Sequence, residues 1–429
     1  MKPDIVIWLV RDTCRVVDNP ALNLATQIAK ERNAYLVPLA CLEPRRWADQ
    51  HFGMPRTGWH WARFRSESLL ALRRDLVARG SGLWVSAEEP VYVLNRMKPS
   101  VNVIKVVCDR PLATEERLEN AQFEAEGYPI VTHDVDDLFR FEQLPFELNE
   151  LPATFSKFRK IVEKKPGLLP DQPVEMRELA PCIDQIWPDP VDWTETFDYK
   201  PSPRAEVETN GGETQAQSHW AAYLDVRALS HYKQTRNAFC GPMQSSHLSA
   251  WLAHGCLSAR QVWSDTLAYE LREGANESTY WLRFELLWRE YFRWYARASD
   301  WTLFRRNGPN DKDVPSDHNS SRFYAWKTGH TNCDIVDAAM RELNETGWMS
   351  NRARQLVASY LIYELNLDWR LGAAYFESQL IDFDVASNWG NWAYIAGVGP
   401  DPRGGRIFNL NDQADRYDPD KSYRRRWLT

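Results

Sequence analysis

The chain has 429 residues, 44% of them hydrophobic, which is enough apolar material for two domains with large cores. A net charge of −7 argues against a strongly basic nucleic-acid binder, and the lack of any long apolar run argues against a transmembrane protein. The apolar run Ile5–Val10 is too short for a signal-peptide core, so we expect a cytoplasmic protein without membrane association.

Cysteine usage restricts the kinds of site that the chain can carry. Its seven cysteines are odd in number, and no two of them have C-x-x-C spacing. We therefore expect neither a disulfide framework nor a metal site, and we interpret the thiols as reduced and mostly buried.

The first 140 residues alternate short apolar runs with helical patterns. Strands are expected at Ile5–Val10, Tyr35–Leu39, Gly82–Ser86, Val101–Val107 and Pro129–His133. Helices are expected at Ala21–Lys30, Arg63–Arg79, Val91–Lys98 and Ala113–Glu126. This alternation predicts an α/β domain over residues 1–140, built on a doubly wound parallel sheet. No G-x-G-x-x-G follows the first strand, so a nicotinamide-type site has no support.

A long connector and a helical domain are expected to follow. Eight of the 25 prolines lie between Lys165 and Arg204, which predicts a connector over residues 141–215. Three- and four-residue apolar spacing then predicts an all-helical domain over residues 216–429. Its expected helices include His219–Lys233, His247–His254, Ala259–Glu273, Ser278–Ala298, Asp334–Glu345, Asn351–Asn366 and Leu371–Gln379.

Three polar clusters in this helical part are candidates for chemistry. The run from Ser245 to Ser249 precedes a helix, where hydroxyls and free N–H groups suit a phosphate, although serine is also a common N-cap. Asn351 and Arg354 share a helix face, with Ser350 as N-cap, and a capped surface helix would explain them equally well. In the run from Asp382 to Tyr394, a buried Asp–Arg pair is at least as good an explanation as a metal site.

Several segments together resemble the photolyase/cryptochrome family, and the DASH cryptochromes in particular. The matching segments, in the family's order, are Trp8–Asn19, Leu151–Glu163, Tyr232–Asn237, Phe284–Phe292, Trp369–Ala373 and Asn391–Arg403. Any one of them could arise by chance, but their order is highly specific. The resemblance implies FAD bound in the helical domain.

Matching positions imply the roles of individual residues around FAD. Residues that would hold the phosphates and ribose are Tyr232, Ser245, Ser246, Leu248 and Ser249, and cavity-lining residues would be Trp281, Glu285 and Arg289. Asn351 would face flavin N5, where a neutral amide can hydrogen-bond without being a strong proton donor. Arg354, paired with Asp382, would lie beside the ring, Asp384 would meet its polar edge, and Asn388 would approach the ring system.

The family's reaction is blue-light-driven repair of cyclobutane pyrimidine dimers in DNA, by an electron from reduced flavin. The residues implied to handle the lesion are Glu285, Trp288, Asn351, Arg352 and Tyr394, with Trp288 and Tyr394 as the two aromatic walls. Duplex-specific relatives carry Trp at the Tyr394 position and Met at the Gln355 position. The DASH-like residues here predict a preference for single strands, and we expect a monomer. The alternatives are an FAD-binding photoreceptor without repair activity, or a flavoprotein that only binds nucleic acid.

Two departures from the family pattern alter what we expect. Cys108-Asp109-Arg110-Pro111 replaces an acidic pair that helps relatives bind a methenyltetrahydrofolate antenna, so we expect no folate at high occupancy.

The family's electron relay uses three tryptophans, of which Trp392 matches the inner one and Trp369 the middle one. The outer one is expected in Asn310–Arg322, which contains no tryptophan. The relay is therefore expected to be truncated, unless Tyr324 or Trp326 substitutes.

Overall fold

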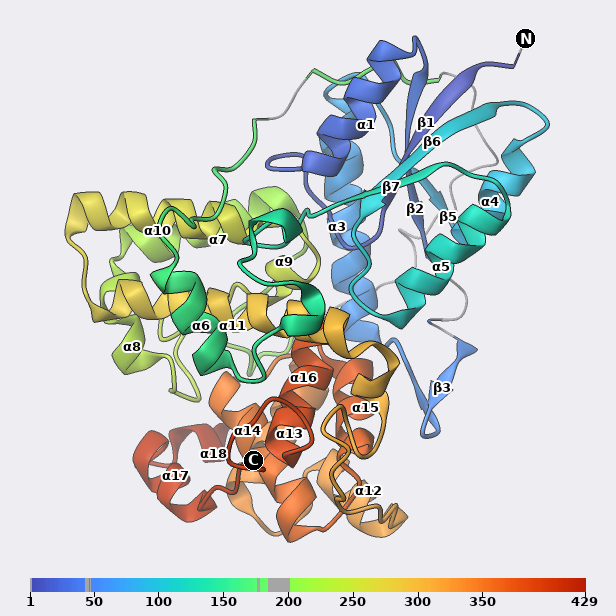
Figure 1. Ribbon diagram of the computed structural model, residues 1–429. Coiled ribbons are helices and arrows are strands. Elements are labelled where there is room, and N and C mark those ends of the chain that lie inside the picture. Colours follow the sequence, from blue (N-terminus) through green and yellow to red (C-terminus); the bar gives the residue numbers. More distant parts are fainter. Residues whose placement is uncertain (1, 43–45, 47, 176–177, 184–200) are drawn as a thin grey trace.

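The computed structural model describes residues 2–42, 46, 48–175, 178–183 and 201–429, and its two domains are joined by a long connector (Figure 1). Within these described ranges, no helix combines the length and apolar character that crossing a membrane requires.

The N-terminal domain is built on a five-stranded parallel sheet, as the alternation of apolar runs predicts. Its strand order is β5-β2-β1-β6-β7, so the chain winds in both directions from the central strand. The strands are β1 (Asp4–Val10), β2 (Tyr35–Cys41), β5 (Trp84–Ser86), β6 (Asn102–Asp109) and β7 (Ile130–His133). A short antiparallel hairpin of β3 (Gln50–His51) and β4 (Met54–Pro55) was not predicted, because two-residue strands carry no periodic signal.

Helices cover both faces of this sheet. They are α1 (Pro20–Glu31), α3 (Trp59–Val77), α4 (Pro90–Met97) and α5 (Thr114–Ala125). Side chains alternate across β1: Val6 and Trp8 share a core with α1 and α3, while Ile5 and Ile7 share one with α4 and α5. The continuous apolar run of the central strand therefore results from burial on two sides.

The connector carries the short helices η1 (Phe141–Gln143) and η2 (Leu148–Glu150) and the helix α6 (Phe155–Lys164). Phe155, Phe158 and Val162 lie on one face of α6 and are buried, and α6 contacts the helical domain through α11. Residues 176–177 and 184–200, within the predicted connector, lie outside the described residues.

The helical domain follows. Its first helices are α7 (Glu213–Asp225), η3 (Ala228–His231), α8 (Tyr232–Thr235), α9 (Ser249–Ala253), α10 (Ala259–Glu273), α11 (Glu277–Ser299) and η4 (Asp300–Phe304). The later ones are α12 (Ser320–Thr328), α13 (Asp334–Thr346), α14 (Asn351–Ser359), the π-helix η5 (Tyr360–Glu364), α15 (Trp369–Gln379), α16 (Val385–Ala396), α17 (Leu410–Tyr417) and α18 (Ser422–Leu428).

Two predicted helix boundaries were wrong for local backbone reasons. The expected helix His219–Lys233 is interrupted at Arg227, which has a left-handed φ of 58° and separates α7 from η3. The expected helix from His247 starts instead at Ser249, because His247 has a φ of 51°. A left-handed residue cannot continue an α-helix, and the residue type alone does not predict that conformation at either position.

The two domains meet across buried charges at the carboxyl edge of the sheet. Asp137, in the loop after β7, accepts hydrogen bonds from Arg293 at 2.7 Å and from Arg297 at 2.8 Å, both on α11. Burial alone would raise the pKa of Asp137, but these two guanidinium groups hold it well below its usual range. Arg289, also on α11, donates to the Asp136 carbonyl at 2.7 Å. Charge pairing thus fixes α11, which lines the candidate site, against the sheet.

Candidate functional site

The helical domain contains a cavity of about 420 Å³. Its walls come from elements far apart in the sequence: α8, α9, α11, α14 and α16. The predicted cofactor residues that line it are Tyr232, Ser245, Ser246, Leu248, Ser249, Glu285, Arg289, Asn351, Arg354, Asp382, Asp384 and Asn388. The predicted residue Trp281 instead packs against Phe284, with the Lys233 ammonium 4.9 Å from its ring centre.

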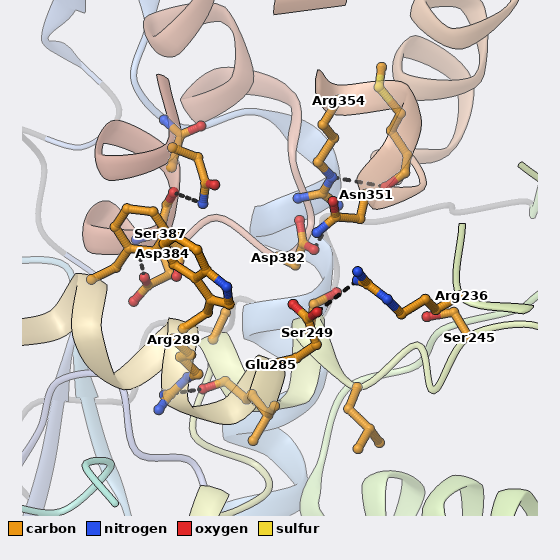
Figure 2. Close-up of a pocket in the computed structure, with 18 of the residues that line it drawn as sticks. Arg236, Ser245, Ser249, Glu285, Arg289, Asn351, Arg354, Asp382, Asp384 and Ser387 are labelled. Carbon is orange, nitrogen blue, oxygen red and sulfur yellow. Dashed lines mark hydrogen bonds and ion pairs between the residues drawn. The ribbon is translucent and has the colours of Figure 1, made fainter. Parts of the chain in front are cut away.

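An ion pair forms one wall of the cavity. The Arg354 Nη2 atom lies 2.7 Å from Asp382 Oδ2, and Arg354 Nε donates to the Met349 carbonyl at 2.9 Å. Figure 2 shows Asn351 beside this pair, so α14 directs both residues toward the same space. The helix begins there because the Ser350 hydroxyl accepts a hydrogen bond from the Ala353 N–H, as predicted for an N-cap.

Several polar atoms on the cavity wall are buried and have no hydrogen-bond partner among the residues that the structure describes. They are Asp382 Oδ1, Asn388 Oδ1 and His247 Nε2. Asn388 is held in place by its amide nitrogen, which donates to the Ala373 carbonyl at 3.0 Å. A buried polar atom without a partner costs free energy, so these atoms are suited to a polar ligand inside the cavity.

Glu285 faces the cavity from α11 and is paired with Arg236, at 2.7 Å between Oε1 and Nη1 (Figure 2). Burial raises the pKa of Glu285 above its usual value, while the Arg236 charge partly opposes this effect. Arg236 was not among the predicted site residues. It comes from a different element, and no local pattern connects it with Glu285.

Two aromatic side chains meet at a corner of the cavity. The Trp288 and Tyr394 rings have centroids 5.7 Å apart and an interplanar angle of 78°, so the two predicted walls are nearly perpendicular. Phe155 of α6 stacks on Trp288 at 3.8 Å and 14°. Arg406 lies over Tyr394, with its guanidinium carbon 4.8 Å from the ring centre. The connector therefore contributes to this corner, which sequence reasoning missed.

Arg352 lies at the edge of the same cavity. Its hydrogen-bond partners are neutral: Gln355 Oε1 at 3.0 Å and Asn237 Oδ1 at 3.2 Å. Burial, together with the charges of Arg236 and Arg416, lowers the pKa of Arg352 below its usual value. A guanidinium with neutral hydrogen-bond partners and cationic neighbours favours an anion from outside the protein.

The two predicted relay tryptophans have different aromatic neighbours. Trp392 lines the cavity and contacts Trp326 edge-on, with ring centroids 6.2 Å apart. Trp369 contacts Trp389 at 5.7 Å and donates to the Arg306 carbonyl at 2.9 Å. Trp326 is fully buried, whereas Tyr324 is 62% exposed. The structure thus brings Trp326 to Trp392, and leaves Tyr324 at the surface.

A second, larger cavity of about 540 Å³ lies between the two domains and shares Ala253 and Asp384 with the first. Three of its acidic residues, Glu115, Glu116 and Glu377, are engaged within the protein. Glu115 is 2.6 Å from Arg56, Glu377 accepts from Arg56 at 3.1 Å, and Glu116 accepts from the Ala113 N–H at 2.9 Å. Among the residues that the structure describes, no cluster of three or more potential metal ligands occurs.

The N-terminal and the C-terminal part of the chain each match a known family model. Residues 5–177 match the family model described as "DNA photolyase", and residues 281–429 match the one described as "FAD binding domain of DNA photolyase".

Individual relatives agree with these matches. The chain is 42% identical to a cryptochrome DASH from Idiomarina loihiensis, over 98% of this chain and 92% of the relative. A crystal structure of a Synechocystis cryptochrome superposes with a TM-score of 0.93 at 36% identity, covering 100% of this chain and 89% of that one. A class III photolyase from Agrobacterium tumefaciens has a TM-score of 0.82 at 26% identity, covering 100% and 86%. The chain therefore belongs to the photolyase/cryptochrome family, within its group of DASH cryptochromes.

Proposed function

We propose that this DASH cryptochrome repairs cyclobutane pyrimidine dimers in DNA under blue light, mainly in single strands, by electron transfer from reduced FAD. The observation that carries the proposal is that one cavity combines the predicted cofactor residues with the corner formed by Trp288 and Tyr394. An electron donor and its acceptor must lie close together, and a shared cavity provides that proximity.

As a member of this family the chain binds FAD, and the cavity fits that cofactor because its walls carry buried polar atoms that have no partner in the described part of the chain. We propose that Tyr232 and the serines between Ser245 and Ser249 bind the phosphate and ribose part. Asn351 would face flavin N5. Arg354 would hold a positive charge beside the ring, and its ion pair with Asp382 balances that charge. When bound, reduced FAD supplies the electron that light promotes.

The lesion would occupy the other part of the cavity. A flipped pyrimidine dimer could contact the face of one ring and the edge of the other, because Trp288 and Tyr394 are nearly perpendicular. Glu285 lies on the same cavity wall, and its carboxyl oxygens could accept a hydrogen bond from a pyrimidine edge. Arg352, whose own partners are neutral, would bind a phosphate next to the lesion.

We expect repair of dimers in single-stranded DNA, with much slower repair in duplex DNA. Tyr394 and Gln355 make the pocket less apolar than the Trp and Met of duplex-specific relatives. Contacts between the dimer and the pocket would therefore offset less of the free energy needed to extrude the dimer from a duplex. Dimer loss is to be measured under light with reduced FAD on matched single-stranded and duplex oligonucleotides. Binding should weaken as salt is raised, because Lys and Arg meet phosphates.

The Tyr394→Trp variant is expected to improve duplex repair relative to single-strand repair. Equal wild-type rates on both substrates would contradict the pocket argument. Absence of repair on either substrate, in protein that retains FAD, would favour a photoreceptor without repair activity.

We also expect no folate antenna at high occupancy. Pro111 stands in the segment that helps relatives bind folate, and three glutamates of the cavity between the domains already accept from Arg56 or a backbone N–H. A pterin ring would therefore have to displace existing contacts. Gently purified protein should lack the folate absorption band, and chromatography of the released cofactors should give FAD alone. Folate at close to one per chain would overturn this expectation.

A further inference from the structure

A third buried tryptophan lies beside the two predicted relay tryptophans. Trp389 and Trp392 are three residues apart on α16, so their side chains leave the helix on the same face. This face packs against α15, where the Trp392 ring occupies the space that a side chain at Gly372 would need. Trp369, one turn before Gly372, contacts Trp389 with ring centroids 5.7 Å apart and an interplanar angle of 77°. The three indoles are therefore grouped where α15 meets α16.

The indole nitrogens of Trp369 and Trp389 have different partners. Trp369 donates to the uncharged carbonyl of Arg306 at 2.9 Å. Trp389 donates to Glu377 Oε2 at 3.0 Å, and the other oxygen of this buried carboxylate accepts from Arg56 at 3.1 Å. An indole that has lost an electron is positively charged, and a carboxylate in a buried site stabilises that charge more than a carbonyl does. The hydrogen-bond partners thus favour a positive charge on Trp389 over one on Trp369.

Trp389 and Glu377 both line the cavity of about 540 Å³ between the two domains. Trp389 is 3% exposed, so a small reductant would meet it by entering this cavity. Trp301 lines the same cavity and is 57% exposed, but the Arg305 guanidinium carbon lies 5.4 Å from its ring centre. A neighbouring cation opposes a positive charge on Trp301. An electron route that ends at Trp389 is therefore favoured over one that continues to Trp301.

We propose that Trp389 is the outer member of this chain's electron relay, with Glu377 as its proton acceptor. When bound, oxidised FAD supplies the light-driven oxidant; the proposal rests on the relay through Trp392 and Trp369, and not on DNA repair. Trp389 gives one electron to oxidised Trp369, and its N–H, made acidic by that loss, gives its proton to Glu377 Oε2. A neutral radical and a neutral carboxyl group result. A thiolate in the cavity later supplies one electron and becomes a thiyl radical, and Glu377 returns the proton to the indole.

The test follows the full-length protein with oxidised FAD by transient absorption after a laser flash, without added thiol. A neutral tryptophan radical should appear, and its formation should be slower in D₂O because a proton moves. In Trp389→Phe the tryptophan radical should decay about tenfold faster or more, since the hydrogen bond from the oxidised indole to a charged group is lost. Glu377→Gln should keep a cationic radical and lose the isotope effect. Steady reduction by an added thiol should still be slow in the wild type, because the thiol has to enter the cavity to meet Trp389.

Trp220 provides a matched control. It is 3% exposed, like Trp389, its N–H donates to the Asp265 carboxylate at 3.0 Å, and it lines neither of the two cavities. Trp220→Phe should leave the radical signal unchanged, whereas Trp392→Phe should abolish it. If the Glu377→Gln protein fails to fold, the isotope effect in the wild type decides, because it reports the proton transfer directly.

The outcomes separate this outer step from the relay that precedes it. A radical that is lost in Trp392→Phe, but has the wild-type lifetime in Trp389→Phe, would overturn the proposal and leave the relay through Trp392 in place. A wild-type radical that stays cationic would overturn the proton transfer to Glu377. Absence of any tryptophan radical in the wild type would refute the relay and its outer member together.

Discussion

Arg354→Ala protein is expected to lose most of its FAD during purification. The substitution would leave the Asp382 carboxylate buried and unpaired, since that side chain is 1% exposed and Arg354 is its ion-pair partner. Breaking a buried pair by removing one partner costs roughly 3–5 kcal/mol. An uncompensated negative charge would then face the space proposed for the flavin ring. The FAD content per chain, from absorbance of the cofactor released on denaturation, measures the effect.

The chain offers a closely matched control. Arg370 and Asp368 form an ion pair with the same 2.7 Å distance and similar exposure, and neither residue lines the cofactor cavity. Arg370→Ala should therefore lower stability while FAD content stays near that of the wild type. Arg354→Lys, which keeps the charge, should retain more FAD than Arg354→Ala. Full FAD content in Arg354→Ala would show that the pair does not serve the cofactor.

Trp392→Phe protein is expected to show no photoreduction of bound FAD by an external thiol. Trp392 is the relay candidate that lines the cofactor cavity, so an electron from the surface would have to pass through it. The wild-type reaction should itself be slow, because Asn310–Arg322 offers no outer tryptophan beyond Trp369. Loss of the oxidised flavin band under blue light with dithiothreitol provides the measurement.

Further variants identify the route that electrons take. Trp326 contacts Trp392, and its own neighbour Tyr375 lies 5.8 Å away, so a branch that avoids Trp369 has a structural basis. A fast wild-type reaction that falls in Trp326→Phe or Tyr324→Phe would show such a rerouted relay. Trp8→Phe, in the sheet of the other domain, is the control for loss of an indole. Photoreduction that is unaffected by Trp392→Phe would refute the relay assignment.

Local sequence patterns were sufficient for most of the architecture. The parallel sheet follows from apolar runs such as Ile5–Val10, which must be buried on two sides. The predicted helix Ala259–Glu273 coincides with α10, because the Ser258 side chain caps its start and Gly274 follows its end. The break at Arg227 was missed, since an arginine gives no local sequence signal for a left-handed backbone conformation.

For the candidate site too, residues within single recognisable segments were predicted, and residues that act through contacts between segments were missed. Glu285 and Asn351 match positions of the family's motifs, and their roles were inferred from that match. Arg236 and Phe155 were missed, because each matters only through a contact across at least 49 residues of sequence: Arg236 with Glu285, and Phe155 with Trp288. Such pairings depend on how separate helices pack, and no periodicity within one segment encodes them.

The charges at the carboxyl edge of the sheet have a wider consequence. In doubly wound sheets this edge commonly receives a small ligand. Here the loop carrying Asp136 and Asp137 receives α11 of the other domain instead. Separating the domains would expose Asp137 without its cations, would leave Arg297 without its anion, and would leave Arg293 with Asp384 at 3.9 Å as its anionic neighbour. We therefore expect the α/β domain and the helical domain to unfold together, and an exchange of either for that of a relative to require its matching half of the interface.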